Sequence, residues 1–169
     1  MTDLQIRPMD ADDSFEELTE LLHRAYASLG VMGFNYTAVD QSVEVTRRRA
    51  ATGECYVGLV AEQIIGTLVL VPPGLRQTHC EWYARPGVWV ISQFGVEPEF
   101  QGLGIGGLMM TFAERRAAQL GAIETAVDTA AGAAHLIALY AKRGYRQVDH
   151  VQWQGKTYRS VVLSKRIEE

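Results

Sequence analysis

The stretch VEPEFQGLGIGG, from Val96 to Gly107, joins a predicted strand to a predicted helix through a glycine-rich turn. Counted from Gly102, it has the G-x-G-x-x-G spacing of a dinucleotide-binding turn; counted from Gln101, it reads Q-x-x-G-x-G, a pyrophosphate turn of another kind. Such a turn presents unpaired N–H groups at the positive end of the helix dipole, and glycine lacks the Cβ atom that would keep an anion away. Both patterns predict a pyrophosphate site. The alternative interpretation is that the glycines bind no ligand and only allow the helix to pack closely against the strand.

Apolar periodicity and turn residues predict a series of strands and helices around this turn. Strands are predicted for residues 4–9, 54–62, 64–73, 88–96, 122–128, 145–153 and 156–165. Helices are predicted for residues 10–30, 37–53, 104–121 and 131–144. The second and third strands form a hairpin, the last two pair across Gln154 and Gly155, and a β-α-β crossover occurs only in the middle. This order predicts a mixed sheet, in a chain whose 169 residues fit one domain.

The dinucleotide-binding interpretation has one supporting feature and three opposing ones. Asp128 lies about 20 residues beyond the glycines, where a ribose-binding acid is expected. However, five residues separate Val96 from Gly102, whereas the first glycine of that fingerprint follows its strand almost directly. The strands before Val88 are predicted hairpins, and only about 60 residues follow Gly107, too few for the remaining parallel strands. A small NAD- or NADP-binding oxidoreductase is therefore kept only as an alternative.

Composition and charge disfavour several other classes of protein. The net charge is −4, and the dense basic run from Arg47 to Arg49 is interpreted as a solvated helix face, so nucleic-acid binding is not expected. Cys55 and Cys80 lack C-x-x-C spacing, which argues against a zinc site, and no metal is predicted. The acidic first residues do not read as a secretory signal, and no apolar run approaches the ~18 residues of a membrane span. The expectation is a soluble cytoplasmic protein that does not bind membranes.

Three segments occur together in a specific order: FGVEPEF at residues 94–100, the turn QGLGIG, and ALYAKRGY at residues 138–145. They resemble the acetyl-CoA-binding core of the GNAT superfamily of N-acetyltransferases, over Val88 to Tyr145. The resemblance implies one N-acetyltransferase domain over residues 1–169, of α/β (α+β) class, with a mostly antiparallel sheet of about seven strands, helices on both faces and splayed central strands. It implies an enzyme that moves an acetyl group from acetyl-CoA to a primary amine by direct attack in a ternary complex. A non-catalytic coenzyme A-binding module is the second alternative.

The coenzyme A contacts implied by the resemblance lie on the predicted central strand and on the turn. Phe94, Gly95 and Val96 would face the pantetheine arm in the gap between the splayed strands, and nearby N–H groups would stabilise the developing oxyanion. The backbone of the turn would hold the pyrophosphate, at Gln101, Gly102, Leu103, Gly104, Ile105, Gly106 and Gly107. One departure is Ala133, where many family members have asparagine; His135 could replace that contact.

Tyr140 matches the tyrosine that protonates the leaving thiolate in many family members. A phenol is close enough in acidity to a thiol to exchange a proton with it when the geometry is right. Alternatively, Tyr140 shares a helical face with Leu136 and Ile137, and it would then be a core residue with a satisfied hydroxyl. The sequence alone leaves both interpretations open, and the glycine-rich turn favours the catalytic one.

The base that takes the ammonium proton is less well determined. We expect Asp128 and Glu97 to act jointly, because each follows or ends a strand near the expected acetyl site; Glu81 and His79 are further candidates. Each also has a purely structural interpretation: Glu97 and Glu81 as solvated surface acids, Asp128 as a helix cap and His79 as a loop residue. A nucleophilic cysteine is disfavoured, because neither cysteine has a paired histidine beyond the adjacency of His79 and Cys80.

The acceptor is expected to bind between Tyr26–Tyr36 and Gln77–Trp89, two segments rich in aromatic residues with a few acids. This composition suits an apolar pocket with an ammonium-binding carboxylate, and it equally suits core and lid. A small-molecule amine and a protein amine both remain open, and the negative net charge favours a cationic small amine. A homodimer would be ordinary for a small enzyme, although no sequence feature indicates its interface.

Overall fold

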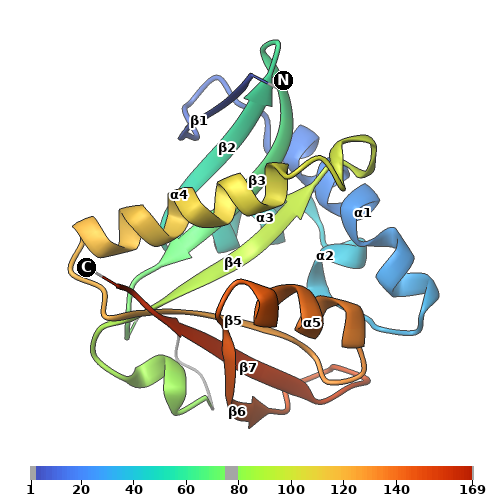
Figure 1. The fold of residues 1–169 in the computed structure, drawn as a ribbon. Coiled ribbons are helices and arrows are strands. Elements are labelled where there is room, and N and C mark those ends of the chain that lie inside the picture. Colours follow the sequence, from blue (N-terminus) through green and yellow to red (C-terminus); the bar gives the residue numbers. More distant parts are fainter. Residues whose placement is uncertain (1–2, 75–79, 169) are drawn as a thin grey trace.

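The computed structural model describes residues 3–74 and 80–168, whose backbone forms one seven-stranded sheet (Figure 1). The strands are β1 (Leu4–Pro8), β2 (Glu54–Val60), β3 (Gln63–Val71), β4 (Val88–Val96), β5 (Glu124–Ala130), β6 (Arg146–Val151) and β7 (Ser160–Arg166). Their spatial order is β1-β2-β3-β4-β5-β7-β6. Neighbouring strands are antiparallel except β4 and β5, which are parallel. The predicted mixed, mostly antiparallel sheet is confirmed.

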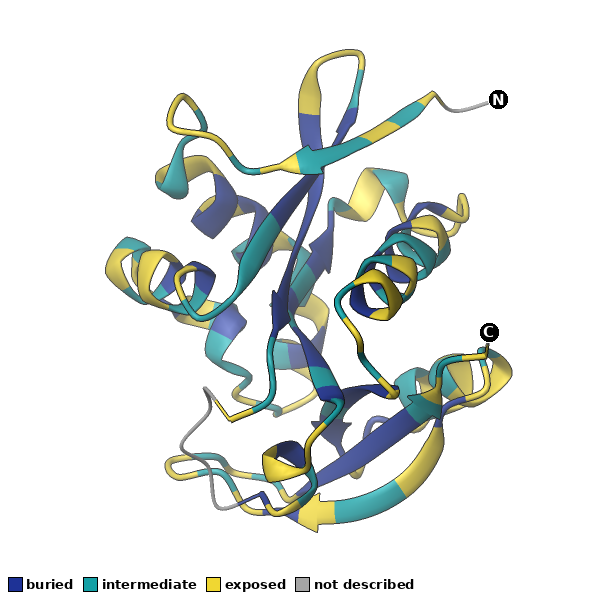
Figure 2. Cartoon of the chain, turned by 90° about the vertical axis from the view of Figure 1, so that its left-hand side faces the viewer, coloured by how far each residue is buried: buried dark blue, intermediate teal, exposed yellow. Residues whose placement is uncertain are grey.

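Helices cover both faces of the sheet (Figure 1). They are α1 (Phe15–Val31), α2 (Thr37–Asp40), α3 (Val43–Ala50), α4 (Ile105–Gln119) and α5 (Ala134–Lys142), with 3-10 turns at Trp82–Ala84 and Pro98–Phe100. Met109 of α4 packs with Leu68 of β3 in the core of one face, and Leu18 of α1 packs with Val57 of β2 in the core of the other. The strands between these helices are buried along most of their length (Figure 2), which accounts for their apolar sequences.

The first helix begins later than the sequence pattern indicates. The prediction starts at Asp10, but α1 starts at Phe15, because the Ser14 side chain caps it by accepting the N–H of Glu17 at 3.1 Å. The preceding acids form a turn instead: the Asp13 carboxylate accepts the N–H of Asp10 at 2.8 Å and pairs with Arg7 at 2.7 Å. The acidic residues before α1 therefore do not extend the helix; Asp13 instead pairs with Arg7 near the end of β1.

The helix predicted over residues 37–53 is in fact two helices. α2 ends at Asp40, and α3 begins at Val43 because the Ser42 side chain accepts the N–H of Val45 at 3.2 Å. Gln41, at the break, has extended backbone angles and a buried side chain. At this break the Gln41 side chain lies in the interior of the protein.

The last hairpin has the turn predicted at Gln154 and Gly155, where the Lys156 N–H donates to Trp153 O at 3.2 Å, but its strands do not pair up to that turn. β6 ends at Val151 and β7 begins at Ser160, so residues 152–159 form a longer connection. The backbone of this connection bonds to the loop after α1 rather than to a strand: Asn35 Oδ1 accepts the N–H of Thr157 at 2.9 Å. The strand predicted from Lys156 therefore begins later, at Ser160, and residue Asn35, distant in the sequence, takes a hydrogen bond from the segment before it.

Candidate active site

β4 and β5 pair only at their beginnings and then separate. The paired rungs are Val88 with Glu124, Trp89 with Thr125, and Val90 with Ala126; beyond them β4 continues to Val96 and β5 to Ala130. A bulge accompanies the separation, since the register of β4 against β3 shifts before Gly95 and Gln93 has a φ of 48°. The implied splay of the central strands is confirmed. We call the unpaired parts the β4 arm (residues 91–96) and the β5 arm (residues 127–130).

The glycine-rich turn at the end of the β4 arm carries a row of unpartnered N–H groups. Gly102 and Gly104 have φ of 79° and 85°, in the left-handed region that glycine enters without steric cost. Within the described part of the chain, no hydrogen bond is donated by the amides of residues 102–107, and the next amide, of Leu108, bonds to Gly104 O at 3.1 Å. These amides stand at the N-terminus of a 15-residue helix, an arrangement that binds anions.

The other residues predicted for this site surround the turn. The Gln101 side chain donates to Val96 O at 2.9 Å and its amide to Pro98 O at 3.2 Å, so Gln101 braces the turn against the strand. Leu103 is exposed, whereas Ile105 is buried and anchors α4. A Cβ atom on Gly106 would lie 3.7 Å from the Phe94 ring, which places Phe94 next to the helix start. Val96 packs in the same core as that ring, and Gly107 lies close to Arg143.

Gly95 lies on the opposite face of the β4 arm. A Cβ atom there would come within 3.1 Å of Leu22 and 3.2 Å of Ala25, both on α1. The close approach of α1 to the strand therefore requires a small residue. It also brings Tyr26 of α1 against the arm, where its hydroxyl donates to Phe94 O at 2.7 Å.

Tyr140 extends from α5 and packs half-buried in the core under α4. Its ring lies 5.8 Å from that of Tyr145. Within the described residues its hydroxyl makes no hydrogen bond. Burial, followed by the neighbouring Tyr26 and Asp128, raises the pKa of Tyr140, so the phenol is protonated at neutral pH. Tyr140 packs against the same core as Phe94 and Val96 of the β4 arm, which places it on the α4 side of the splay.

Aromatic side chains gather on the α1 face of the splay. We call Tyr26, Phe34, Tyr36 and Tyr158 the aromatic cluster; their ring centroids lie 5.1 to 6.2 Å apart in contacting pairs. The Tyr36 hydroxyl accepts the N–H of Ala130 at 3.0 Å and lies 2.7 Å from Thr129 Oγ1, on the β5 arm. Since Tyr26 bonds to the other arm, the cluster bridges both arms and satisfies backbone groups that the splay leaves unpaired.

Asp128 projects from the β5 arm toward the same face. Its Oδ1 accepts the Tyr83 hydroxyl at 2.6 Å and its Oδ2 accepts Trp153 Nε1 at 2.9 Å. These donors fix the carboxylate, and an ionised carboxylate can accept more than two hydrogen bonds. The geometry allows Asp128 to hold an ammonium group beside the aromatic cluster.

The other proposed bases are arranged differently. Glu97, just after the β4 arm, is held by Arg24 of α1, whose Nε lies 3.1 Å from each carboxylate oxygen and whose Nη2 also bonds to it. Glu97 thus lies on the same side of the sheet as Asp128, and its carboxylate already forms an ion pair with Arg24. Glu81 is exposed before the 3-10 turn at Trp82–Ala84, and His79 lies outside the described residues. The structure thus brings Asp128 and Tyr140, but not Glu81, to the splay.

The α5 residues near the splay differ in exposure. Ala133, which replaces the asparagine of many family members, is buried at the start of α5, whereas His135 is exposed. A contact of His135 with coenzyme A stays a prediction.

Two residues at this site went unnoticed in the sequence. Tyr158 lies in the connection that was predicted to pair as a strand, and Arg49 belongs to the run that was interpreted as a solvated face. By contrast, Tyr26, Phe34 and Tyr36 lie in the aromatic segment Tyr26–Tyr36 that the sequence indicated. The residue type of Tyr158 could have predicted that it packs against other residues, since an aromatic side chain in a polar connection requires a packing partner.

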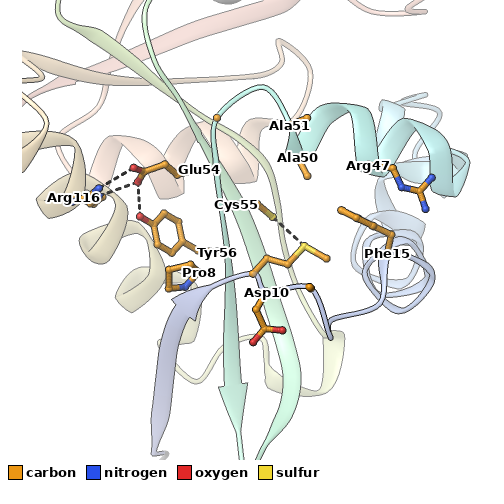
Figure 3. A pocket seen from close by; sticks show the side chains of 13 residues that line it. Pro8, Asp10, Phe15, Arg47, Ala50, Ala51, Glu54, Cys55, Tyr56 and Arg116 are labelled. Atoms are coloured by element: carbon orange, nitrogen blue, oxygen red, sulfur yellow. Dashed lines mark hydrogen bonds and ion pairs between the residues drawn. The ribbon is translucent and has the colours of Figure 1, made fainter.

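A separate cavity of about 610 Å³ lies between β1, β2, α3 and α4, away from the splay (Figure 3). Three of its polar side chains are paired with one another: Arg116 Nη2 lies 2.8 Å from Glu54 Oε1, and the Tyr56 hydroxyl donates to the same carboxylate. Burial raises the pKa of the Cys55 thiol in its wall to about 11, and burial also raises the pKa of Cys80. Both thiols are therefore neutral and poorly nucleophilic at neutral pH.

Residues 3–74 and 80–168 show neither a metal-binding cluster nor a membrane-spanning helix. No cluster of three or more His, Cys, Asp or Glu side chains there could hold a metal ion. No helix of that part is long and apolar enough to cross a membrane.

The buried tyrosines predict a steep loss of stability at alkaline pH. Burial raises the pKa of Tyr26 and Tyr56 to about 12 and also raises the pKa values of Tyr140, Tyr145 and Tyr158. An unfolded phenol titrates near pH 10, so this stabilisation is complete below about pH 10 and is lost as the pH rises through the folded pKa values. Urea midpoints should be flat up to about pH 9.5 and then fall, with tyrosinate absorbance rising together with loss of circular dichroism. Tyrosinate formation by all seven tyrosines in the folded protein would contradict this expectation.

Comparisons with known proteins agree with this geometry. The model of the family described as "Acetyltransferase (GNAT) family" matches residues 15–145. The S-(2-succino)cysteine N-acetyltransferase of Bacillus subtilis is 27% identical over 154 residues, which cover 90% of each chain. A GNAT family acetyltransferase from Elizabethkingia anophelis with acetyl-CoA bound has a TM-score of 0.70 at 20% identity, covering 97% of this chain and 98% of that one. A Bacillus subtilis acetyltransferase in complex with CoA has a TM-score of 0.68 at 21% identity, covering 98% and 100%.

Proposed function

Because this chain belongs to the GNAT family of acetyltransferases, we propose that it acetylates the amino group of a small molecule by direct attack in a ternary complex. Membership makes it an acetyl-CoA-dependent N-acetyltransferase, and nothing in the comparisons supports an oxidoreductase. The acceptor, the residue roles and the extent of the domain, taken as residues 1–169, are parts of the proposal. The observation that carries it is the splay, which is flanked by an anion-binding turn and an orienting carboxylate.

The residues around the turn fit coenzyme A. The unpartnered amides of residues 102–107 suit a pyrophosphate, and Phe94, Gly95 and Val96 line the β4 arm, along which a pantetheine arm would run. Bound there, acetyl-CoA supplies the activated acetyl group. N–H groups of the β4 arm are proposed to stabilise the oxyanion that develops when the amine attacks. Tyr140, protonated and without an internal hydrogen-bond partner among the described residues, is proposed to give its proton to the departing sulfur.

The base is proposed to be Asp128. Its carboxylate is fixed by Tyr83 and Trp153 beside the aromatic cluster, where an ammonium group gains both charge pairing and contact with aromatic faces. Deprotonation of that ammonium then frees the lone pair that attacks the thioester. Glu97 remains a proposed second base, and its ion pair with Arg24 makes the comparison of the two variants informative.

A small acceptor is favoured over a protein amine. The aromatic cluster bridges the two arms on the proposed acceptor side of the splay, and its rings suit contact with a small apolar or cationic amine. The Bacillus subtilis relative is itself named for a small-molecule acceptor, S-(2-succino)cysteine.

Two measurements test this function. Acetyl-CoA, and not NAD or NADP, should raise the thermal unfolding midpoint, because a ligand that binds only the folded state stabilises it. A panel of amines should then release free thiol from acetyl-CoA, with acetylated product found by mass spectrometry. Binding without turnover on any amine would favour the coenzyme A-binding module, and absence of stabilisation at millimolar acetyl-CoA would refute the proposal.

Gly104→Ala is expected to weaken acetyl-CoA binding by about tenfold or more, because alanine is strained at positive φ and the turn must rearrange. The matched control is Gly121→Ala: Gly121 has a φ of 90°, and like Gly104 it has no atom within 4 Å of an added Cβ. Both variants should lose about 1 kcal/mol of stability, but only Gly104→Ala should change the Kd measured by calorimetry. Equal Kd values for the two variants would remove the turn from the binding site.

Location and assembly are proposed on weaker grounds. Cys55 and Cys80 are free thiols, which suits a reducing compartment such as the cytoplasm, where acetyl-CoA is also available. A homodimer is proposed as ordinary for an enzyme of this size, and light scattering decides it.

A further inference from the structure

Arg49 departs from the solvated face predicted for the run Arg47–Arg49. Arg47 lies over the Phe15 ring, 5.1 Å from its centroid, and Arg48 is exposed. Arg49 is half-buried: its Nη1 lies 2.8 Å from Gln41 Oε1, and its Nη2 lies 3.5 Å from Ser92 Oγ on the β4 arm. The interpretation of the whole run as solvated was therefore wrong for Arg49, which reaches from α3 to the sheet.

Arg49 and Asp128 flank the splay from opposite arms. Ser92, the contact of Arg49, lies two residues after Val90, and Asp128 lies two residues after Ala126, its partner in the last rung. Val90 and Ala126 belong to the same core, so Ser92 and Asp128 also face that side of the sheet. A fixed cation and a fixed carboxylate therefore stand on either side of the widening gap between the strands.

The aromatic cluster lies between these two charges. Burial is the main cause of the raised pKa of Tyr26 and of Tyr158. Against it, the positive charge of Arg49 lowers both pKa values, and the negative charge of Asp128 adds to the rise of both. Each phenol is thus within the field of both groups, which agrees with the positions given by the strand register.

A second cation, Lys156, lies beside the aromatic cluster, next to Asn35. Lys156 Nζ donates to Asn35 O at 2.9 Å, in the connection that closes over the cluster. Burial, and then the charge of Arg49, lowers the pKa of Lys156, while Asp40 acts in the opposite direction. Two cations close enough to affect each other form a surface that favours an anion.

A buried network holds Arg49 in place. Gln41, at the break between α2 and α3, accepts from Arg49 and donates from Nε2 to Gln93 Oε1 at 2.9 Å and to Thr46 Oγ1 at 2.7 Å. Gln93 is the bulge residue of β4. The same distortion that separates the strands therefore anchors the guanidinium, so its position is built into the site rather than left to a surface rotamer.

We propose that the acceptor is an amino acid or a related amine that also carries a carboxylate: Arg49 binds the carboxylate, and Asp128 holds the amino group at the thioester. This inference rests on the proposed function. It makes Arg49 the residue that distinguishes amino acids from simple amines, since a planar guanidinium matches a carboxylate with two parallel hydrogen bonds.

The test compares α-amino acids with the amines that lack only their carboxylate, for example phenylalanine with phenethylamine and methionine with 3-(methylthio)propylamine. The wild-type protein should show kcat/KM at least about tenfold higher for the amino acids. Arg49→Gln should lower kcat/KM for the amino acids by about 30-fold, mainly through KM, and leave the amines within about threefold. Arg49→Lys, which keeps the charge without the planar fork, should fall between the two.

The control variant is Arg48→Gln, which removes the same charge from the adjacent exposed position and should leave both acceptor classes unchanged. Thermal unfolding and the Kd for acetyl-CoA report whether Arg49→Gln is folded; if it is not, Arg49→Lys and the wild-type preference decide. Equal losses for amino acids and amines, or a wild-type preference for the amines, would overturn the inference. Turnover without a carboxylate preference refutes this inference alone, whereas no turnover on any amine refutes the proposed function.

Discussion

Asp128→Asn is expected to lower kcat/KM for protonated amines by about 10³-fold, because the variant cannot take the ammonium proton. The measurement is a pH–rate profile of thiol release with wild-type and variant protein at saturating acetyl-CoA. In the variant the rate should keep rising with pH as the free amine becomes available in solution. An acceptor whose amine is already neutral at the assay pH should recover most of the lost rate, since it needs no base.

Two further observations distinguish a base from a merely structural carboxylate. Asparagine cannot satisfy both Tyr83 and Trp153 as aspartate does, so some stability is lost, and thermal unfolding measures it separately. Glu97→Gln, made in parallel, should change the rate less than tenfold because Glu97 is already paired with Arg24. If the neutral amine is not recovered in Asp128→Asn, or if Glu97→Gln shows the larger loss, the assignment of the base to Asp128 is wrong.

Tyr140→Phe is expected to reduce kcat by about 10²-fold with little change in KM or in the Kd for acetyl-CoA, because only the leaving thiolate loses its proton donor. Stability should hardly change, since within the described residues the Tyr140 hydroxyl has no hydrogen bond to lose. Rapid-mixing kinetics of thiol release with a good acceptor is the measurement. A thioester with a more acidic leaving thiol should be affected less.

Tyr145→Phe is the matched control for this substitution. The Tyr145 hydroxyl lies 3.0 Å from Thr125 Oγ1 and donates to Glu114 at 3.0 Å, and its ring touches that of Tyr140. Removing it should cost about 1 kcal/mol of stability and leave kcat unchanged. The opposite pattern, in which Tyr140→Phe loses stability and keeps its rate, would make Tyr140 a core residue, the alternative that its helical face allowed.

The elements with strong periodicity could be predicted from the sequence, and so could the turn. The hairpin of β2 and β3, the central strand, and α4 after the glycines each follow from residues within one short window. The family resemblance then added the splay, which no periodicity indicates, because separation of two strands depends on the bulge at Gln93 and on partners far away in the chain. The range predicted for the first helix began before its Ser14 cap, and the break that precedes the Ser42 cap was not predicted.

The acceptor side of the site was the least predictable part. The tyrosines of the aromatic cluster come from α1, from the segment after it and from the connection after β6, and only tertiary packing brings them together. The contact of Arg49 with the sheet was not predicted for another reason. Neighbouring arginines on a helix of eight residues point in different directions, and the sequence does not show which of them faces the sheet. The break at Gln41 was not predicted either, and Gln41 is the residue that accepts a hydrogen bond from Arg49.

The three rungs between β4 and β5 have a mechanical consequence. They are the only ladder joining the four strands β1 to β4 to the three strands β5 to β7 in the described chain. A molecule that occupies the splay and contacts both arms would therefore add a second connection between the two halves of the sheet. Amide hydrogen exchange along β5 should slow when coenzyme and acceptor are bound, because opening the seam then requires releasing them. If the substrates bind in the splay as proposed, the same separation of strands that admits them also makes them part of what joins the two halves of the sheet.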